Sequence, residues 1–488
     1  MELSQQNHNG NQAEIEITTR THSLSRRFVI FLRVMIVLAM LAGAGVIGVV
    51  GGGLNPFIAV AVGALPFLLV GLERLLAHFE WMPILIVILA TFVPLSIPTG
   101  TGSNVVDSLA ATSAFFAIWV VKMLIIDKRI SFINGKVTKP LLGYIIAVVI
   151  SIVWSNLFLD WAVKSYGSFI KVQLASAVVM IMLPGAFLLV ANNVKQELHL
   201  KIMVWLVLLG GAFALVRNYG NIPLPVNQKG LFPMWAVALA YAMALFNEKL
   251  PKLVRGALFL YTGVWVVWGF VLNISWVAGW FPVILVIGII TVLRSWKLVL
   301  LFVLIGLLVF ALNADYYLGK VLRDEQEESG ETRLAAWLVS FRVVRYHWVF
   351  GTGPAGYTAY YMTYYPSEAM ATHNNYLDIL AQTGVVGLTL YLLFFIYVAR
   401  LGLHLALRLR KERNFLSALA MATFAGTIGG IVMMGFGDWM VPFAYTQSIE
   451  GFDFIVHNWM FMGAVVVIEQ LVNKRDAVLA LEGESSES

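Results

Sequence analysis

The residues of this chain that suit chemistry gather in one polar segment, 314–375, which ends in His373-Asn374-Asn375. The middle of the segment is highly charged, with Arg323, Asp324, Glu325, Glu327, Glu328, Glu331 and Arg333. A histidine can act as a general base near neutral pH, and an arginine can bind phosphate oxygens through paired, charge-assisted hydrogen bonds. The segment therefore places a candidate base in the same loop as fixed positive charge.

His373 comes directly before a predicted helix cap. Asn374 or Asn375 is a natural N-cap for an apolar helix that begins near Tyr376. The positive end of the helix dipole disfavours imidazolium there and favours the neutral ring that a general base needs. A lone histidine at a membrane boundary is more often structural, and the cap is the observation that favours a base. Asp378, five residues on, is a candidate carboxylate for orienting it.

Three further positions are candidates for binding an anion. Arg217 ends an apolar stretch, and Lys229 closes the loop that follows, so both can point toward one cavity. A snorkelling arginine that reaches the lipid headgroups explains Arg217 equally well. Arg333 opens an amphipathic helix with apolar residues at i, i+3 and i+4 spacing: Leu334, Trp337, Leu338, Phe341 and Val344. Arg342 and Arg345, on the opposite flank, are expected to face solvent or headgroups.

Composition fixes the class of protein. The chain is 60% hydrophobic and 12% charged, with mean hydropathy +0.82, and its apolar stretches are long enough to cross a bilayer. We therefore expect an all-α polytopic integral membrane protein of about 12–14 transmembrane helices. The predicted spans are 28–50, 56–76, 82–98, 105–126, 140–158, 169–191, 200–217, 231–247, 254–274, 276–293, 297–313, 376–399, 414–434 and 453–472. The chain has no cysteine, which excludes disulfides and thiolate catalysis.

The spans divide the chain into five parts. We expect a disordered cytoplasmic tail at 1–27, transmembrane helices at 28–313, a large outer loop with short helices at 314–375, and transmembrane helices at 376–473. A second cytoplasmic tail follows at 474–488, and its acidic end (Glu482, Glu484 and Glu487) is expected to be disordered.

The distribution of Lys and Arg predicts the orientation. With the N-terminus inside, 24 of the 33 basic residues lie in inner segments. Nine lie outside: Lys164, Lys171, Arg217, Lys229, Lys320, Arg323, Arg333, Arg342 and Arg345. The positive-inside rule therefore places both termini in the cytoplasm and the 314–375 loop on the outer face. Because the basic residues lie between helices rather than in one patch, no nucleic-acid partner is expected.

The glycine string Gly351-Thr352-Gly353-Pro354-Ala355-Gly356 matches the spacing of a nucleotide-binding loop. A tight turn explains it better, since the string lies outside and has a Pro where a helix should begin. The outward-facing histidines (His347, His373 and His457) have no companions at ligand-like spacing, so neither a metal nor another cofactor is expected. Acid–base groups and fixed cations are then what the outer loop offers.

Five tyrosines (Tyr357, Tyr360, Tyr361, Tyr364 and Tyr365) precede His373. Aromatic faces suit sugar rings, and the aromatic belts of membrane interfaces use the same residues.

Residues 330–395 resemble the bacterial O-antigen ligase and polymerase superfamily. The resemblance is carried by His373-Asn374-Asn375-Tyr376-Leu377 and Gln382-Thr383-Gly384-Val385-Val386-Gly387-Leu388, with Arg333, Trp337 and the glycine string upstream. It implies a type C glycosyltransferase-like fold in the bacterial plasma (inner) membrane. The implied activity is metal-independent transfer of a glycan from undecaprenyl diphosphate to an acceptor hydroxyl on the outer face, in polysaccharide or lipopolysaccharide biosynthesis, with inversion at the anomeric carbon.

Carried over by motif, His373 is the base that deprotonates the acceptor, and Arg333 binds the donor diphosphate. The resemblance also implies Arg217, at the end of an earlier span, as a second diphosphate ligand. Lys229 is a further candidate because it closes the loop that follows Arg217. The chain departs from the family pattern at Trp276, where an arginine is expected. Asp438 is expected to face outward after the thirteenth span and is a candidate for orienting His373.

Several alternatives stay open. The acceptor can be a glycan, a lipid A core or a protein hydroxyl, and membrane lipid is a partner in each case. A polymerase of O-antigen or exopolysaccharide would share the donor and take a lipid-linked acceptor. A polysaccharide or lipid transporter is the second alternative, although the spans show no internal repeat and are nearly free of charge.

Overall fold

The computed structural model describes residues 78–98, 104–133, 135–163, 167, 169–227, 229–273, 277–312, 314–315, 319, 330–366, 371–443 and 448–486. The predicted spans at 28–50 and 56–76, most of the charged run and Trp276 lie outside these residues. The chain divides into two compact units: Met1–Met82 with Ala117–Ser131, and Pro83–Phe116 with Phe132–Ser488. In the first, Lys122 pairs with Asp127 at 2.6 Å. All the candidate residues belong to the second.

The described secondary structure is almost entirely helical. The first group of helices is α3 (Met82–Phe92), α4 (Asp107–Val121), α5 (Gly135–Leu157), α6 (Phe169–Asn193), α7 (Glu197–Gly220), α8 (Phe232–Phe246), α9 (Lys252–Val266), α10 (Val277–Arg294) and α11 (Trp296–Leu312). The second group is α13 (Gly330–Val344), α14 (Gly356–Tyr364), α15 (Asn375–Leu409), α16 (Phe415–Met433) and α17 (Phe452–Ser486). Wider π-type turns extend α4 to Ile126 and α9 to Leu272, and a 3-10 turn (Phe79–Trp81) precedes α3.

Nine helices among the described residues are long and apolar enough to cross a membrane, and three shorter apolar helices accompany them. This confirms the predicted all-α polytopic class. The twelve predicted spans that fall within the described residues each coincide with a helix. The short helices expected in the large loop are α13 and α14.

The predictions for the end of the span at 82–98 and for the C-terminal end of the chain were wrong. The helix in the predicted span 82–98 ends at Phe92, because Pro94 lacks an N–H for the helix and disfavours a helical backbone at Val93 before it. Strand β1 (Ser96–Pro98) then pairs antiparallel with β2 (Asn104–Val106). The acidic C-terminal end, predicted to be disordered, is helical as far as Ser486.

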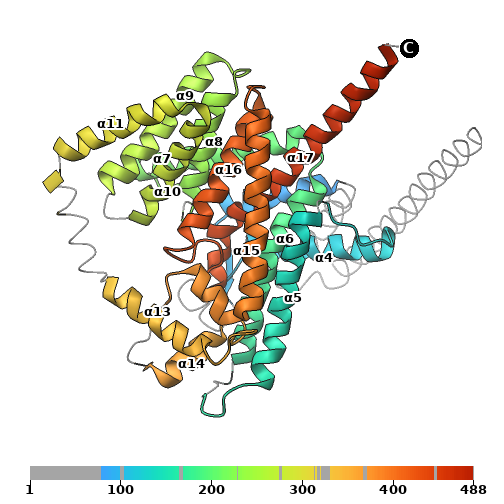
Figure 1. Ribbon diagram of the computed structural model, residues 1–488, viewed down its shortest axis with the longest axis vertical. Helices are drawn as coiled ribbons and strands as arrows, with labels where there is room; N and C mark the ends of the chain where they lie inside the picture. The colour runs from blue at the N-terminus through green and yellow to red at the C-terminus, as the bar shows by residue number, and fades with distance from the viewer. Residues whose placement is uncertain are drawn as a thin grey trace, which may run out of the picture. The chain divides into compact units, whose positions relative to one another are not determined.

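Helix α15 is central in the second unit and packs against α5 and α16, while α17 packs against α6 (Figure 1). Aromatic side chains fill the contact between α15 and α17. The rings of Phe394 and Trp459 stack with centroids 5.5 Å apart, and Phe187 on α6 meets Phe394 edge-on at 5.0 Å. The core of the unit therefore surrounds the middle of α15.

One end of this unit carries the His373 turn, and we call it the His373 face. There the start of α15 contacts the end of α16 through a 2.8 Å hydrogen bond from Asn375 N to Met434 O. The loop after α5 contacts α14 through a 2.5 Å hydrogen bond from the Tyr364 hydroxyl to Asp160 Oδ2. Helices α13 and α14 lie at this end (Figure 1).

The opposite end carries the turn between α15 and α16, and we call it the Arg413 face. Arg413 contacts Glu248, which follows α8, and Arg475 on α17 contacts Glu412. Helix α16 joins the two faces over 19 residues, a rise of about 28 Å, close to the hydrocarbon thickness of a bilayer. The loops that meet at the His373 face and those that meet at the Arg413 face are the same two groups that the count of Lys and Arg assigns to opposite sides of the membrane. Which set faces outward stays a prediction.

Candidate active site

The glycine string after α13 is a tight turn that docks against the backbone of α15. Thr352 N donates to Ala381 O at 2.8 Å and Gly353 N donates to Gln382 O at 2.9 Å. One turn on, Val385 N donates to Trp348 O at 2.8 Å. These hydrogen bonds pair backbone carbonyl and N–H groups of α15 that have no partner within the helix because α15 is kinked there. The turn thus anchors the loop to the helix that begins beside His373.

Glycine is required on both sides of this contact. Gly384, with φ +67°, forms the kink, and a Cβ there would lie 2.2 Å from Val349 O. Gly351, with φ +70°, would place a Cβ 2.5 Å from Gln382 O. Both backbones adopt the left-handed region that side chains disfavour. The structure therefore agrees with the prediction of a tight turn rather than a nucleotide loop.

A buried chain of polar side chains strengthens the docking. Gln382 Oε1 accepts from Ala355 N at 2.8 Å, and Gln382 Nε2 donates to Asp378 Oδ2 at 2.8 Å. Asp378 is 1% exposed, so it does not face water, which the sequence left open. Its other oxygen, Oδ1, is buried without a hydrogen-bond partner among the described residues. Within the described contacts, Asp378 therefore acts on the glycine turn.

The His373 turn is held by its neighbours. Asn374 caps α15, since its Oδ1 accepts from Tyr376 N at 2.9 Å and from Leu377 N at 3.3 Å. This confirms the predicted cap and selects Asn374 as the capping residue. His373 itself has φ +46° and is half-buried, and no hydrogen bond to its ring occurs in the described part of the chain. The ring is thus placed by backbone rather than by a side-chain partner.

Asn375 joins this turn to the loop after α16. Its Nδ2 donates to Val441 O at 2.8 Å, and its Oδ1 accepts from Met440 N at 2.8 Å. The residue is fully buried. Asp438 lies in the same loop, where its Oδ2 accepts from Phe443 N at 3.3 Å. The loop that carries Asp438 is therefore fixed against the residues that follow His373.

Helix α13 reaches the His373 turn through Trp337. The indole Nε1 donates a 2.8 Å hydrogen bond to Thr372 O, directly before His373. Arg333 is half-buried one turn earlier, and residues four apart share a helix face. The α13 face that contacts the His373 turn is thus the face that carries Arg333.

The buried stripe of α13 differs from the predicted one. Ala336, Val339, Ser340 and Val343 are buried, whereas Leu334, Leu338 and Phe341 are about half exposed or more, and only Val344 of the predicted stripe is buried. Small residues allow close packing against α14, where Ser340 Oγ donates to the Tyr357 hydroxyl at 3.0 Å. In a membrane protein an apolar side chain can meet lipid, so apolar spacing alone does not identify the packed face. Arg342 and Arg345 are exposed, as expected.

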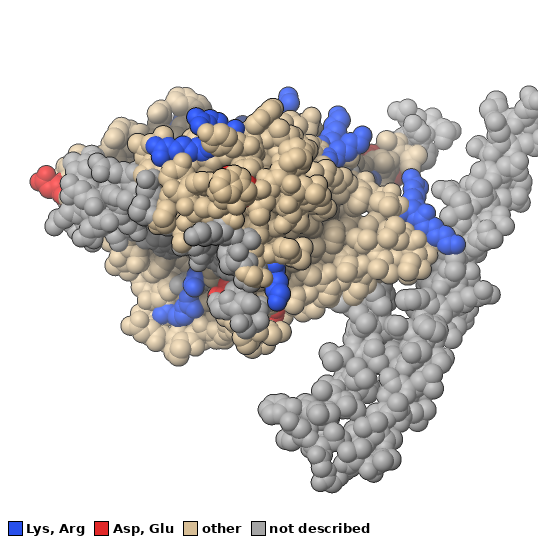
Figure 2. Space-filling view, turned by 90° about the horizontal axis from the view of Figure 1, so that it is seen from below, with Lys and Arg blue, Asp and Glu red and all other residues tan. Residues whose placement is uncertain are grey.

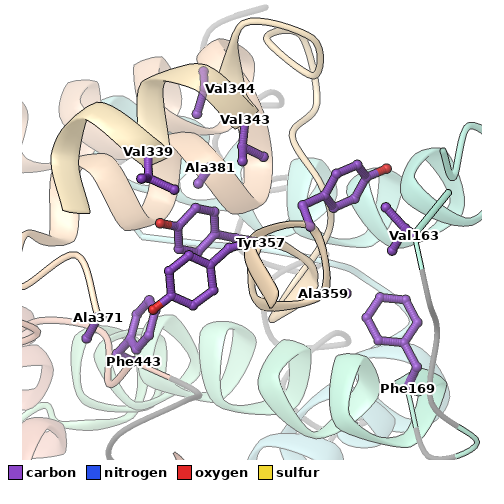
Figure 3. Packing of buried hydrophobic residues seen from close by; sticks show 12 residues of the cluster. Val163, Phe169, Val339, Val343, Val344, Tyr357, Ala359, Ala371, Ala381 and Phe443 are labelled. Atoms are coloured by element: carbon purple, nitrogen blue, oxygen red, sulfur yellow. The ribbon is translucent and has the colours of Figure 1, made fainter. Parts of the chain in front are cut away.

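Three of the five tyrosines before His373 belong to a packed cluster (Figure 3). Tyr357, Tyr360 and Tyr361 are buried, and the rings of Tyr357 and Tyr361 stack at 5.4 Å. The cluster also contains Ala371, two residues before His373, and Phe443, from the loop after α16. Burial raises the pKa of Tyr357 to about 12. These three rings therefore pack the loop and are not displayed to a sugar.

A second polar group fixes α14 to the loop after α5. The Tyr364 hydroxyl donates to Asp160, which lowers the pKa of that carboxyl and raises the pKa of the Tyr364 hydroxyl to about 12. The ring of His347 meets the ring of Tyr360 edge-on at 4.5 Å. Burial lowers the pKa of His347, and nearby Asp160 partly opposes that shift. A neutral imidazole therefore suits this contact.

Arg217, in the last turn of α7, and Lys229, just before α8, lie at the two ends of the loop between these helices. Arg217 Nη1 donates to Val226 O at 2.7 Å, so the guanidinium folds back over its own loop. Lys229 Nζ lies 4.8 Å from the ring centroid of Phe454 at the start of α17. One turn further along α17, Asn458 donates to Trp439 O at 2.7 Å. The first turns of α17 thus connect this loop to the one that carries Asp438.

The basic side chains seen from the His373 end stand in separate groups rather than in one continuous field (Figure 2). The arrangement as a whole is a helical membrane protein with a structured loop, in which a hydrogen bond from Trp337 joins the helix that carries Arg333 to the turn that carries His373.

One family model, described as O-antigen ligase, matches residues 255–392. The match runs from α9 into α15, includes Arg333 and His373, and leaves out Arg217, Lys229 and Asp438. It confirms the resemblance predicted from the sequence and supports membership of the O-antigen ligase and polymerase superfamily. The match supports an O-antigen ligase- or polymerase-like function and, together with the nine long apolar helices among the described residues, a multi-pass membrane location. No curated protein sequence matches the chain.

Sequence reasoning missed two features of the site. The pairing of the glycine turn with the α15 kink had a signal in Gly351, Gly353 and Gly384, all of which have positive φ. The network around Asn375 had none, because its partners lie more than fifty residues away in the sequence.

Proposed function

We propose that this protein transfers a glycan from undecaprenyl diphosphate to an acceptor hydroxyl on the outer face of the bacterial plasma membrane. The observation that carries the proposal is the Trp337–Thr372 hydrogen bond, since it joins the helix face that bears Arg333 to the turn that bears His373. The family match over residues 255–392 supports the same class of substrate, a lipid-linked glycan.

His373 is the proposed general base. Its imidazole takes the proton of the acceptor hydroxyl while the acceptor oxygen attacks the anomeric carbon of the donor sugar. The bond from that carbon to the diphosphate oxygen breaks, and undecaprenyl diphosphate leaves. Attack from the face opposite the leaving group inverts the anomeric carbon. A positioned base contributes about 10²–10⁴-fold to such a step.

Arg333 is the proposed ligand of the donor diphosphate. A guanidinium can bind two phosphate oxygens at once and stabilises the charge that builds on the leaving group. Arg217 and Lys229 are proposed as further diphosphate ligands, approached from the first turns of α17. Asp438 and Asp378 are proposed as groups that orient the site. Asp378 would do so through Gln382 and the glycine turn.

The test is an assay with purified protein, a lipid-linked oligosaccharide and each acceptor class in turn. H373A should lower transfer by about 10²-fold or more, as expected for loss of a general base. H404A is the matched control, because His404 is an exposed histidine on the same helix, nearer the Arg413 face. If H373A transfers glycan as fast as H404A, His373 is not the base.

Arg333 is tested in the same assay. R333Q should weaken use of the donor, whereas R342Q should not, since Arg342 is exposed and stacks over Tyr365 at 5.6 Å. The acceptor series separates the two forms of the proposal: transfer to a second lipid-linked glycan identifies a polymerase, and transfer to lipid A core or to a protein hydroxyl identifies a ligase. Movement of intact lipid-linked glycan without transfer would identify a transporter.

A further inference from the structure

The Arg413 face contains a basic cavity that the proposed transfer reaction does not use. It has a volume of about 460 Å³, within the usual range of ligand pockets, and is lined by Arg294, Arg410, Lys411 and Arg413. Arg294 is the last residue of α10, and the other three form the turn between α15 and α16. Two helix ends thus bring four cations to one space.

The hydrogen bonds around the cavity hold two of these cations in place. Arg410 Nη2 donates to the backbone carbonyl of Arg294 at 2.9 Å, which joins the two helix ends. Arg413 Nη1 lies 2.6 Å from Glu248 Oε1. Arg413 also adopts φ +49°, and its carbonyl accepts from Glu248 N at 3.0 Å. The turn is therefore a built structure rather than a set of loose side chains.

Charge at the cavity is not balanced. Glu248 pairs with Arg413 and, at 3.8 Å, with Arg294. Within the described residues, neither Arg410 nor Lys411 forms an ion pair with a carboxylate. Four cations against one carboxylate leave three positive charges in excess. Positive charges held close together repel one another, and a bound anion would offset this repulsion.

The cavity lies where a membrane boundary is expected. Helix α16 separates it from the His373 turn by about 28 Å, close to the thickness of a hydrocarbon core. Leu403 and Leu407 are exposed on α15 seven and three residues before Arg410, so all three side chains share a helix face. Leu403 and Leu407 thus form a short apolar patch between the exposed Arg400 and the cavity. Trp296, which is 65% exposed, marks the same level at the start of α11.

We propose that this cavity is a phosphate-binding site that is separate from the glycan-transfer site. Guanidinium and ammonium groups are the side chains best suited to phosphate oxygens, and basic pockets at helix ends bind lipid headgroups. The phosphate can belong to an acidic phospholipid, whose chains would lie along Leu403 and Leu407, or it can be free in solution. Its chemistry is the same in both cases.

The experiment uses the full-length chain purified in neutral detergent. Retention of phosphatidylglycerol and phosphatidylcholine is measured by native mass spectrometry, and binding of inorganic phosphate by its effect on thermal unfolding. R410Q/K411Q removes the two cations that pair with no carboxylate in the described part of the chain, and R410K/K411R keeps their charge. K195Q is the matched control, because Lys195 is an exposed lysine of the same face, beside the Gln470–Ala191 hydrogen bond.

We expect phosphatidylglycerol to be retained over phosphatidylcholine, and R410Q/K411Q to lower that retention about tenfold or more, since charge-assisted bonds dominate phosphate binding. R410K/K411R and K195Q should bind like the original chain. Retained phosphatidylglycerol identifies the lipid headgroup as the source, and a thermal shift with inorganic phosphate alone identifies the free anion. Equal binding by R410Q/K411Q and K195Q, or no binding of either phosphate, would overturn the proposal. Glycan transfer at the His373 site is measured in a separate assay. Failure of the phosphate-binding proposal can therefore be distinguished from failure of the proposed transferase function.

Discussion

Trp337 donates a 2.8 Å hydrogen bond to the backbone carbonyl of Thr372, and this bond links α13 directly to the His373 turn. Thr372 is 1% exposed, so its carbonyl is withdrawn from water and depends on this donor. Arg333 lies one helical turn before Trp337. The distance between the proposed base and the proposed diphosphate ligand is therefore set in part by a residue that need not touch substrate.

The first prediction concerns this link. W337F keeps an aromatic ring and removes the N–H, which leaves the Thr372 carbonyl unpaired at a cost of about 1–3 kcal/mol. We expect glycan transfer to fall roughly fivefold to a hundredfold if that cost appears in the transition state. The measurement is kcat and KM for the lipid-linked donor.

The matched control is W348F. Trp348 belongs to the same loop but is 60% exposed, and its described hydrogen bond uses only its backbone carbonyl. We expect W348F to transfer glycan at nearly the original rate. If W337F and W348F are equally active, the Trp337–Thr372 bond does not position the site.

The second prediction separates the Asn374 cap from stability in general. N374A and N414A each remove an N-cap, since Asn414 Oδ1 accepts from Ser417 N at 2.9 Å at the start of α16. Each substitution should cost about 1 kcal/mol of stability. Only N374A should also lower glycan transfer, because Asn414 lies on the Arg413 face. N374S should restore both properties, as serine is a comparable cap.

This comparison has two readouts, thermal unfolding and transfer rate. Equal loss of transfer in N374A and N414A would mean that activity follows overall stability and that the cap does not position His373.

Much of the fold was predictable because transmembrane helices are encoded by long apolar runs. The same property hid other features. Strands β1 and β2, of three residues each, carry no usable period. Strand β1 lies at the end of the predicted span 82–98, and β2 overlaps the start of the predicted span 105–126. The buried face of α13 was predicted wrongly because Leu334, Leu338 and Phe341 are apolar yet exposed. In lipid, apolar spacing does not separate a packed face from a free one.

The site was predictable where its signals are local. Asn374 caps the helix that follows it, and a cap is readable from adjacent residues. The glycine turn was readable as a turn, and Gly384 is a sequence signal for a kink, but the pairing of the two was not readable, because backbone pairing across thirty residues leaves no periodic pattern. The Asn375 bonds to Met440 and Val441 are longer in range still.

The third prediction is a pH dependence at the contact between α14 and the loop after α5. Burial lowers the pKa of His347, so the opened state binds protons more readily than the closed state. The stability of the contact is then fully present above the ordinary histidine pKa of about 6.5 and declines as the pH falls below it. The lowered pKa of Asp160 acts in a separate window, where stability is lost as the pH falls through the acidic range below about 4.

Hydrogen–deuterium exchange of residues 159–163 and 356–364 measures this contact. After correction for intrinsic exchange, we expect faster exchange at pH 5.5 than at pH 7.5. H347Q should remove the difference between the two pH values, because glutamine does not titrate. Y364F should keep that difference while weakening the contact at both pH values. Exchange that is independent of pH in the original chain would contradict the assignment to His347.

The last prediction concerns the close contact between the glycine turn and the α15 kink. G384A places a methyl group 2.2 Å from Val349 O on a backbone with φ +67°, and neither side of the contact is a flexible side chain. We expect this variant to lose the docking of the turn, with lower yield, a clear fall in unfolding temperature and loss of transfer. G351A should behave similarly, since its Cβ would meet the backbone of Gln382 at 2.5 Å.

G288A, in the middle of α10, is the control because a Cβ there meets nothing within 4 Å. Alanine in a helix is favoured over glycine by about 1 kcal/mol, so G288A should be as stable as the original chain or more so. A G384A protein that unfolds and transfers like G288A would show that the turn does not need this contact.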